Sequence, residues 1–462
     1  MSTHVVVLAA GQGKRMFSDL PKVAHPVAGR PMVGWVLDTV EPLKPVSTVV
    51  VVGHGADHVL QILPEGAVSA LQTEQLGTGH ATSVGLAAIE DIADDDVVVV
   101  LYGDTPLLTT GLVERLASLE PSEVGRLVTT TLEDPTGYGR ILRADNGDVV
   151  GVVEEGDCTD EQRKIGEVNA GFYAIRARPL LTALAGLTAD NAQGEYYLTD
   201  VVGILSAGGD KLVAVNASPE EVSGINSQDQ LADARKVIQR RVNQRLLESG
   251  VSMLDPDRTY IDDTVEVAPG VMIYPGVHLE GSTRIGAGSR IGPDVYAKDT
   301  VVGEGNIIWY AVMRSAVIED GCEVGPYASL RPGTVLKTGS KVGTFVETKN
   351  AVLGEGAKAS HQAYLGDVTI GARTNIGAGA ITVNYDGTSK NRTEIGEDTF
   401  IGSDSMLVAP LTIGDRAYTG AGSVITEDVP DDALAIERSE QKLIPDYSER
   451  RRARKARLDA ED

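Results

Sequence analysis

Hydrophobic positions follow two different rhythms along the chain, and the change lies near residue 226. Before it, continuous apolar runs of strand length alternate with amphipathic, helix-like stretches such as residues 32–39 and 79–89. Three valine-rich runs have the pattern of buried parallel strands: residues 5–10, 47–53 and 96–104. This alternation predicts a doubly wound, Rossmann-like α/β domain over residues 1–226.

The segment that follows has the period of an α-helix. Its apolar positions share one face: Leu231, Ala234, Ile238, Val242 and Leu246. Ser227 and Gln230 match a capping box at its start, and Gly250 is a natural stop. The pattern predicts one long linker helix over residues 227–250.

A six-residue period then takes over, with two phase slips. The recurring positions form three blocks: Ile261, Val267, Ile273, Leu279, Ile285 and Ile291; Ile318, Val324, Leu330, Leu336 and Val342; Ile395, Ile401, Leu407, Ile413 and Thr419. Hexapeptide repeats are typical of a parallel β-helix, in which one apolar side chain per hexad enters a narrow core. Small corner residues account for 52 glycines beside only 4% aromatic residues. We expect a β-helix over residues 251–437 and a tail over 438–462.

The composition of the chain limits the kinds of partner and site that it can have. A net charge of −25 argues against nucleic acid or an anionic membrane as the main partner. Cys158 and Cys322 are the only cysteines, so neither a disulfide framework nor a cysteine metal site is expected. The chain shows no signal peptide and no apolar stretch near the ~18 residues of a membrane span, which predicts a soluble, cytoplasmic protein. We interpret the arginine-rich tail as a solvated or frayed segment rather than as a functional basic patch.

The stretch "LAAGQGKRM" (residues 8–16) follows the first predicted strand and has the chemistry of a phosphate-binding loop. It fits neither the dinucleotide pattern, since Met16 replaces the third glycine, nor the P-loop pattern. Arg15 and Lys22 can place cations near phosphates held by the loop amides. Asp104 ends a buried strand, where α/β sheets bind ligands, and Mg²⁺ prefers one or two protein oxygens plus substrate phosphates. Capping is the alternative role for Asp104, and solvation is the alternative for the two cations.

A second cluster is predicted in the repeats. Arg331 and Lys349 are separated by about one eighteen-residue turn, a spacing that stacks residues on one face of the solenoid, and with His361 they could meet in one cleft. A lone structural histidine, or a β-helix that only forms trimers, is the alternative. Only His278 and His361 lie in the repeats, too few for a three-histidine zinc site. The insertion at residues 382–394 is a further candidate for binding residues.

Several motifs in the first half of the chain are similar to those of a known enzyme family. In order, "LAAGQGKRM", "LQTEQLGTGHA", "YGDTPLL", "EVNAGFY" and "GINSQDQL" resemble the sugar-nucleotide pyrophosphorylases. Together with the hexads, residues 4–440 are similar to the bacterial bifunctional N-acetylglucosamine-1-phosphate uridyltransferase/glucosamine-1-phosphate acetyltransferases. This resemblance implies acetyl transfer from acetyl-CoA to glucosamine-1-phosphate, and then uridylyl transfer from UTP to N-acetylglucosamine-1-phosphate with release of pyrophosphate. It further implies a left-handed β-helix, a homotrimer and a product, UDP-N-acetylglucosamine, that serves cell-wall and lipopolysaccharide synthesis.

The resemblance also implies roles in the first half of the chain. The UTP and UDP-sugar site would use Leu8, Ala9, Ala10, Gly11, Gln72, Gly77, Thr78, Tyr102 and Gly103. The N-acetylglucosamine moiety would be held by Gly139, Glu154, Asn169 and Tyr196. Arg15 and Lys22 would neutralise the UTP phosphates, and Asp104 and Asn226 would ligate Mg²⁺.

In the repeats, the resemblance implies that His361 is the general base of acetyl transfer. Glucosamine-1-phosphate would be bound by Arg331, Lys349, Tyr364, Asn375 and Lys390. Acetyl-CoA would be bound by Ala378, Asn384, Tyr385, Ser403, Ala421 and Arg438. Two alternatives remain: a uridyltransferase whose β-helix only oligomerises or senses an effector, and a non-enzymatic sugar-nucleotide-binding scaffold. The full set around His361 favours the bifunctional enzyme over the first, and Asp104 with Asn226 argues against the second.

Overall fold

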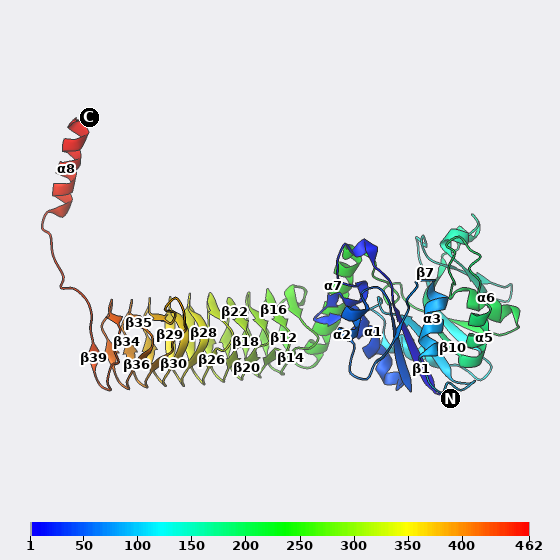
Figure 1. The fold of residues 1–462 in the computed structure, drawn as a ribbon, viewed down its shortest axis with the longest axis horizontal. Coiled ribbons are helices and arrows are strands. Elements are labelled where there is room, and N and C mark those ends of the chain that lie inside the picture. Colours follow the sequence, from blue (N-terminus) through cyan, green and yellow to red (C-terminus); the bar gives the residue numbers. More distant parts are fainter. Residues whose placement is uncertain (1, 462) are drawn as a thin grey trace. The chain divides into compact units, whose positions relative to one another are not determined.

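The computed structural model describes residues 2–461, with all of their side chains except those of Lys14 and Glu461. The chain forms two compact units (Figure 1). The first comprises the chain up to Arg245 together with Ile261–Thr264, and the second comprises Leu246–Tyr260 and the chain from Val265 onward.

A mixed sheet forms the centre of the first unit, with the strand order β11-β7-β10-β6-β1-β4-β5. Its strands are β1 (Thr3–Ala9), β4 (Ser47–Val52), β5 (Val68–Leu71), β6 (Val97–Tyr102), β7 (Gly125–Thr131), β10 (Glu167–Arg176) and β11 (Leu212–Asn216). The antiparallel pair β8 (Arg140–Arg143) and β9 (Val149–Val153) joins the sheet through β10. A separate short pair is β2 (Pro26–Val27) and β3 (Arg30–Pro31). The strands β6, β1, β4 and β5 are parallel, so their carboxyl ends meet at one edge.

Helices cover both faces of this sheet. On one face are α1 (Met32–Val40) and α4 (Thr110–Ala117), packed against alternate strand residues such as Val5 and Val7. On the other are α3 (Thr78–Ala87), α5 (Ala177–Ala185) and α6 (Asp200–Ala207), packed against Val6 and Leu8. The first unit also contains α2 (Ala56–Ile62), η1 (Lys14–Met16), η2 (Lys22–Ala24), η3 (Glu41–Leu43), η4 (Glu155–Asp157) and η5 (Gln162–Lys164). Burial on two faces explains the continuous apolar runs, and the predicted doubly wound domain is confirmed.

The long helix α7 spans Gln228–Glu248. Its five predicted apolar positions are at most 7% exposed. The capping detail differs from the prediction. Gln230 Oε1 accepts a hydrogen bond from the backbone N–H of Asn226 (2.7 Å), one residue before the predicted cap, and the Ser227 hydroxyl is hydrogen-bonded to Asp229 instead. The consequence is that the helix start fixes Asn226, which is one of the predicted metal ligands.

The second unit is the predicted left-handed parallel β-helix. One sheet contains β12 (Ser252–Met253), β15 (Met272–Ile273), β18 (Arg290–Ile291), β21 (Ile307–Ile308), β24 (Glu323–Val324), β27 (Lys341–Thr344), β29 (Lys358–His361), β31 (Asn375–Ile376), β34 (Phe400–Ile401), β37 (Tyr418–Thr419) and β39 (Leu434–Ala435). The remaining strands are β13 (Thr259–Ile261), β14 (Glu266–Val267), β16 (Val277–Glu280), β17 (Arg284–Ile285), β19 (Tyr296–Lys298), β20 (Val301–Val302), β22 (Ala311–Arg314), β23 (Val317–Ile318), β25 (Ala328–Leu330), β26 (Val335–Leu336), β28 (Glu347–Leu353), β30 (Tyr364–Ile370), β32 (Ile381–Val383), β33 (Thr393–Ile395), β35 (Met406–Val408), β36 (Leu411–Ile413) and β38 (Val424–Ile425). A short turn, η6 (Pro256–Arg258), precedes β13.

The hexad positions form the core of this solenoid. Of the sixteen or so predicted positions, all but Val267 are at most 3% exposed, and Val267 is half-buried. Successive coils keep their register: Lys341 pairs with Lys358, and Lys358 with Asn375. Asn375 then pairs with Phe400, because the insertion at residues 382–394 leaves the coil between β32 and β33 without disturbing the stack.

The tail, for which we expect a solvated or frayed segment, is exposed to solvent from residue 438 to residue 460. It forms the helix α8 (Tyr447–Glu461), whose side chains are exposed from Tyr447 to Ala460. None of the helices within residues 2–461 combines the length and the apolar character that a bilayer crossing requires.

Candidate active sites

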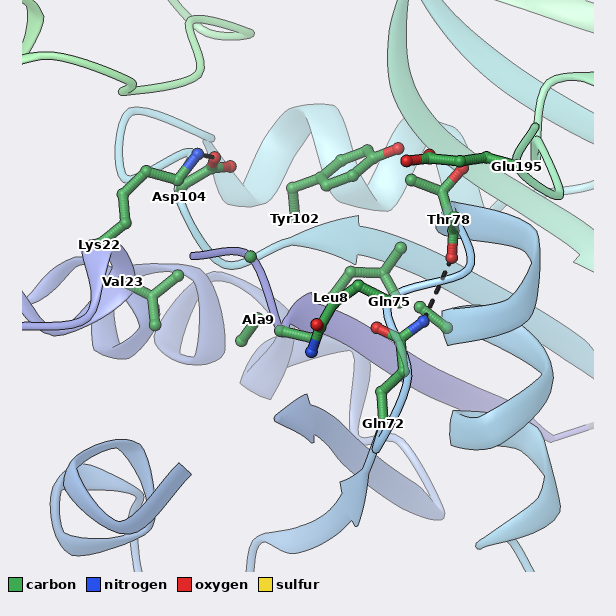
Figure 2. A pocket seen from close by; sticks show the side chains of 14 residues that line it. Leu8, Ala9, Lys22, Val23, Gln72, Gln75, Thr78, Tyr102, Asp104 and Glu195 are labelled. Atoms are coloured by element: carbon green, nitrogen blue, oxygen red, sulfur yellow. Dashed lines mark hydrogen bonds and ion pairs between the residues drawn. The ribbon is translucent and has the colours of Figure 1, made fainter. Parts of the chain in front are cut away.

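A pocket of about 270 Å³ lies at the carboxyl ends of β1 and β6 (Figure 2). It is lined by Leu8, Ala9, Ala10, Gly11, Lys22, Val23, Gln72, Gln75, Gly77, Thr78, Ala81, Tyr102, Asp104 and Glu195. The structure thus gathers most of the residues predicted for nucleotide binding into one cavity. Gly103 lies behind them, and its N–H donates to Leu8 O (2.9 Å), tying the end of β6 to the end of β1.

Lys22 lies beside the glycine-rich loop because Gly13 leaves room for it. Gly13 has a φ of +62°, in the left-handed region that favours glycine. A Cβ at this position would lie 2.7 Å from Lys22 Cβ. The glycine therefore serves both the turn and the placement of the lysine. Arg15 belongs to the same loop but is exposed and lies outside the pocket lining.

The Lys22 ammonium lies between two oxygen-bearing side chains. It forms an ion pair with Asp104 Oδ2 and donates to Asn226 Oδ1 (2.9 Å). The Lys22 and Asp104 side chains are only 13% and 16% exposed. Figure 2 shows Lys22 and Asp104 facing each other at one end of the pocket. Ile225 N–H also donates to Asp104 O (2.9 Å), so the chain that bears Asn226 is tied directly to the end of β6.

The opposite end of the pocket is formed by the second glycine turn. Gln72 is buried, and its Nε2 donates to Gly77 O (3.3 Å). Gly77 has a φ of +107°, and a Cβ there would lie 2.6 Å from Tyr196 O. Thr78 Oγ1 accepts from Leu198 N (3.0 Å), while Tyr196 is held by backbone bonds to the same turn. These contacts fix the turn as a rigid wall.

Three of the residues predicted for the sugar lie together nearby. Glu154 is in contact range of Gly139, since a Cβ at Gly139 would lie 3.4 Å from its Oε2. Gly139 O accepts from Asn169 N (2.8 Å), and Glu154 Oε1 accepts from the Thr199 hydroxyl (2.9 Å). Burial raises the pKa of Glu154, which the Thr199 hydrogen bond only partly offsets. Burial likewise raises the pKa of Tyr102, with negative charge on Glu154 adding to the effect.

Cationic side chains gather on the β-helix around Tyr364. Arg331 Nη1 donates to Glu347 Oε1 (2.8 Å), and Glu347 pairs in register with Tyr364. Lys349 and Lys390 are close neighbours, and the nearby Lys349 ammonium lowers the pKa of Lys390. Such a concentration of positive charge has the chemistry of an anion site.

Asp367 lies among these cations and anchors the insertion. Burial alone would raise the pKa of Asp367, but hydrogen bonds from Asn350 (2.7 Å) and Asn384 (2.5 Å), together with the lysine charges, lower it overall. Asn384 is buried as a result, whereas its neighbour Tyr385 is exposed. The loop therefore starts from a fixed point.

His361 is the last residue of β29 and is exposed. It pairs in register with Thr344, and continuing the β29–β31 register brings Ala378 beside it. Asn375 lies at the start of that register, opposite Lys358. His361 and Tyr364 thus lie at either end of one short turn between β29 and β30.

The residues predicted for acetyl-CoA follow one corner of the solenoid. Backbones approach so closely here that a Cβ at Gly377 would lie 2.6 Å from Ser403 N, and one at Gly402 would lie 2.7 Å from Ala421 N. Arg438 Nη1 continues the row by donating to Ala421 O (3.1 Å). Glycine at this corner therefore allows the backbones of successive coils to approach closely.

Known protein families match both the α/β unit and the β-helix. A family described as the MobA-like NTP transferase domain matches residues 5–199, and one described as bacterial transferase hexapeptide (six repeats) matches residues 392–427. The bifunctional protein GlmU of Caldanaerobacter subterraneus subsp. tengcongensis is 44% identical, covering 94% of this chain and 95% of its own. GlmU of Brevibacillus brevis is 45% identical, covering 96% and 97%, and GlmU of Streptomyces avermitilis is 46% identical, covering 97% and 94%.

The chain belongs to the bifunctional GlmU family. The resemblance drawn from the motifs is confirmed. This GlmU-family chain is a bifunctional enzyme whose uridyltransferase and acetyltransferase activities make UDP-N-acetylglucosamine from small-molecule substrates.

Four residues that line the pocket at the strand ends were not predicted: Val23, Gln75, Ala81 and Glu195. Gln75 and Glu195 had a usable signal, because Gln75 lies in the glycine turn "EQLGTG" and Glu195 follows Gly194 in "QGEYY". Val23 and Ala81 are ordinary apolar residues whose exposure to a cavity only the fold reveals.

Proposed function

We propose that the two sites divide the two reactions between them. Uridylyl transfer takes place in the pocket at the strand ends. Acetyl transfer takes place at the cationic site on the β-helix, where glucosamine-1-phosphate is the acceptor. The observation that supports this most directly is the Lys22 ammonium held between Asp104 and Asn226 at the pocket rim, a charge arrangement suited to phosphates and a cation.

In uridylyl transfer, an oxygen of the sugar 1-phosphate attacks the α-phosphorus of UTP, and pyrophosphate leaves. The attacking group is already an anion, so positioning and charge neutralisation are the main requirements. The loop backbone, Gln72, Gly77 and Thr78 hold uracil and ribose, Tyr102 lines the same pocket, and Gly103 supports it from behind through its hydrogen bond to Leu8 O. Lys22 and Arg15 bind phosphate oxygens. Glu154 and Asn169, with Gly139 and Tyr196, orient the N-acetylglucosamine moiety.

The Asp104 and Asn226 oxygens fit Mg²⁺. Both already face one cationic atom, the Lys22 nitrogen, and both are hard oxygen donors. Within residues 2–461 no cluster of three or more His, Cys, Asp or Glu forms a fuller metal site, which suits an ion that completes its shell with phosphates and water. Asp104 and Asn226 would hold the ion, which supplies charge neutralisation at the phosphates when bound.

In acetyl transfer, His361 takes a proton from the glucosamine-1-phosphate ammonium group. The free amine then attacks the thioester carbon of acetyl-CoA, and the nitrogen loses its second proton to solvent as the carbon–sulfur bond breaks. CoA leaves as the thiol after the thiolate takes the proton held by His361. Arg331, Lys349 and Lys390 bind the phosphate, and Tyr364 and Asn375 complete the sugar site. Acetyl-CoA lies along the corner row of Ala378, Ser403, Ala421 and Arg438, covered by Asn384 and Tyr385.

The assembly belongs to the same proposal. We divide the chain into a uridyltransferase domain (1–226), a linker helix (227–250), the acetyltransferase β-helix (251–437) and a tail (438–462). The β-helix exposes a ring stack, Tyr310–Tyr327–Phe345, in which the latter two are 56% and 65% exposed. Exposed apolar surface of this kind supports association, and we propose a cytoplasmic homotrimer.

Two single substitutions test the division. His361→Ala should abolish CoA release from acetyl-CoA and glucosamine-1-phosphate but leave UTP-dependent pyrophosphate release intact. Asp104→Ala should have the opposite effect. Loss of both activities in a folded His361→Ala protein would contradict separate sites, and unchanged uridylyl transfer in Asp104→Ala would remove that residue from the metal site.

A further inference from the structure

Two chain segments lie side by side and contain Gly139 and Glu154, which are proposed to bind the sugar. One, residues 134–139, leads into β8, and the other, residues 154–164, follows β9. The antiparallel register pairs Arg140 with Val153, which brings Gly139 beside Glu154. The relative position of these two residues therefore depends on what joins the two segments.

Arg140 lies immediately after Gly139 and is almost completely buried, with 2% of its side chain exposed. Its Nη1 donates to Tyr138 O and its Nη2 donates to Glu155 Oε2 (2.7 Å). Its Nε is buried without a hydrogen-bond partner in the described part of the chain. Burying a guanidinium costs folding free energy unless the group is paired, so the positive charge of Arg140 depends on the carboxylate of Glu155.

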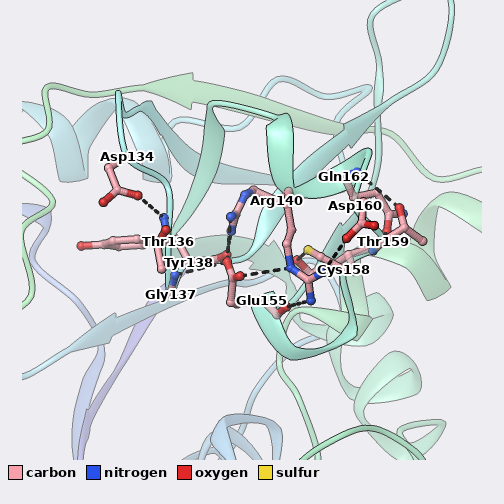
Figure 3. A network of polar contacts seen from close by, with 12 residues as sticks. Asp134, Thr136, Gly137, Tyr138, Arg140, Glu155, Cys158, Thr159, Asp160 and Gln162 are labelled. Atoms are coloured by element: carbon pink, nitrogen blue, oxygen red, sulfur yellow. Dashed lines mark hydrogen bonds and ion pairs between the residues drawn. The ribbon is translucent and has the colours of Figure 1, made fainter.

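Glu155 joins both segments through one carboxylate. Oε2 accepts from Arg140 and also from Gly137 N (3.2 Å) (Figure 3). Oε1 lies 3.4 Å from Arg163 Nε. The hydrogen bond from Arg140 and the one from Gly137 N–H lower the pKa of Glu155, so it is ionised at neutral pH. Gly137 has a φ of +88°, so the loop approaches the carboxylate in a conformation that favours glycine.

We propose that Arg140 and Glu155 are positioning residues for the sugar-1-phosphate substrate of uridylyl transfer. Each directly follows an amino acid proposed to bind the sugar: Arg140 follows Gly139, and Glu155 follows Glu154. The Arg140–Glu155 ion pair therefore fixes the distance between Gly139 and Glu154. Thr199 restrains the same Glu154 carboxylate from the other side. This inference rests on the proposed function, which assigns Gly139 and Glu154 to the N-acetylglucosamine moiety.

The test is steady-state uridylyl transfer by full-length Glu155→Gln and Arg140→Lys variants, with UTP and N-acetylglucosamine-1-phosphate varied separately. A displaced binding group typically costs a factor of ten to a hundred, so the KM for the sugar phosphate should rise by roughly that factor. The KM for UTP should stay within about twofold, because the nucleotide end of the pocket is untouched. Acetyl transfer should be unchanged.

Glu123→Gln is the matched control. It breaks another arginine–glutamate pair, Arg126–Glu123 (2.7 Å), beside the start of β7, at the opposite end of β10 from Arg140, and should leave both KM values unchanged. If Glu155→Gln fails to fold, Arg140→Lys, which keeps the charge, decides alone. An unchanged sugar-phosphate KM, or equal rises in both KM values, would overturn the proposal.

Glu154→Ala distinguishes a failure of the positioning role from a failure of the proposed sugar site. If it raises the sugar-phosphate KM and Glu155→Gln does not, the positioning role is wrong while the proposed sugar site stands. If Glu154→Ala has no effect on that KM, the proposed sugar site itself is wrong.

Discussion

Substituting Gly13 with alanine tests how the glycine-rich loop works. The new methyl would lie 2.7 Å from Lys22 Cβ, well inside the separation of about 3.5–4.0 Å at which carbon atoms attract. Lys22 must therefore move, and its ammonium leaves the position between Asp104 and Asn226. A lost hydrogen bond to a charged group costs about 1.5–3 kcal/mol, and each 1.36 kcal/mol is about tenfold in rate, which predicts a roughly 10- to 150-fold fall in kcat/KM for uridylyl transfer.

The backbone penalty must be separated from the displacement of Lys22. Gly66 supplies this control, because its φ is +88° and a Cβ there meets nothing within 4 Å. Both alanine variants should lose about 1–2 kcal/mol of unfolding free energy from the left-handed conformation alone. The assays are urea unfolding and pyrophosphate release, with CoA release as an internal standard. Equal uridylyl-transfer rates in Gly13→Ala and Gly66→Ala would refute the reasoning.

Three further predictions concern stability and assembly. Hydrogen bonding from Ser2 N–H lowers the pKa of Asp96, so this carboxylate stabilises the fold above its unfolded pKa of about 3.9, and the stabilisation is lost as pH falls below that value; between about pH 6 and about pH 3, urea unfolding should show a smaller loss of unfolding free energy for Asp96→Asn than for the parent chain. Gly377→Ala should lower the melting temperature and raise the KM for acetyl-CoA, because its methyl would lie 2.6 Å from Ser403 N and overpacking costs about 1–3 kcal/mol; unchanged values for both would contradict the close corner. A chain cut after Ser249 should retain uridylyl transfer but elute as a monomer in light-scattering chromatography, and a trimeric fragment would exclude the β-helix as the assembling element.

Much of the fold was predictable because it is encoded locally. The hexad residues and the valine runs report burial by spacing alone, and nearly all of them are buried where expected. Asp104 and Lys22 were predictable as site residues because strand ends and glycine turns have known chemistry. Their direct pairing was not, since it depends on how far Gly13 lets two loops approach.

Other features could not be derived from local pattern. An arginine is expected at the surface, so nothing in "GYGRI" marks Arg140 as buried or names Glu155 as its partner. The Gln230 side chain matched a capping box, yet it bonds Asn226 N, a choice set by where the preceding loop ends. Arg15 had the right chemistry for a phosphate ligand, but the conformation of its short turn leaves it exposed.

The coil register around residues 382–394 has a consequence for how this scaffold can diversify. Ile381 and Val383 pair with Met406 and Val408 as though the intervening loop were absent. In a solenoid each repeat contacts only its neighbours, so the loop can lengthen, shorten or change composition while the coils above and below keep their alignment. Changes in this loop are thereby decoupled from the stability of the coils, so the surface that the loop presents can vary while the ladder beneath it stays the same.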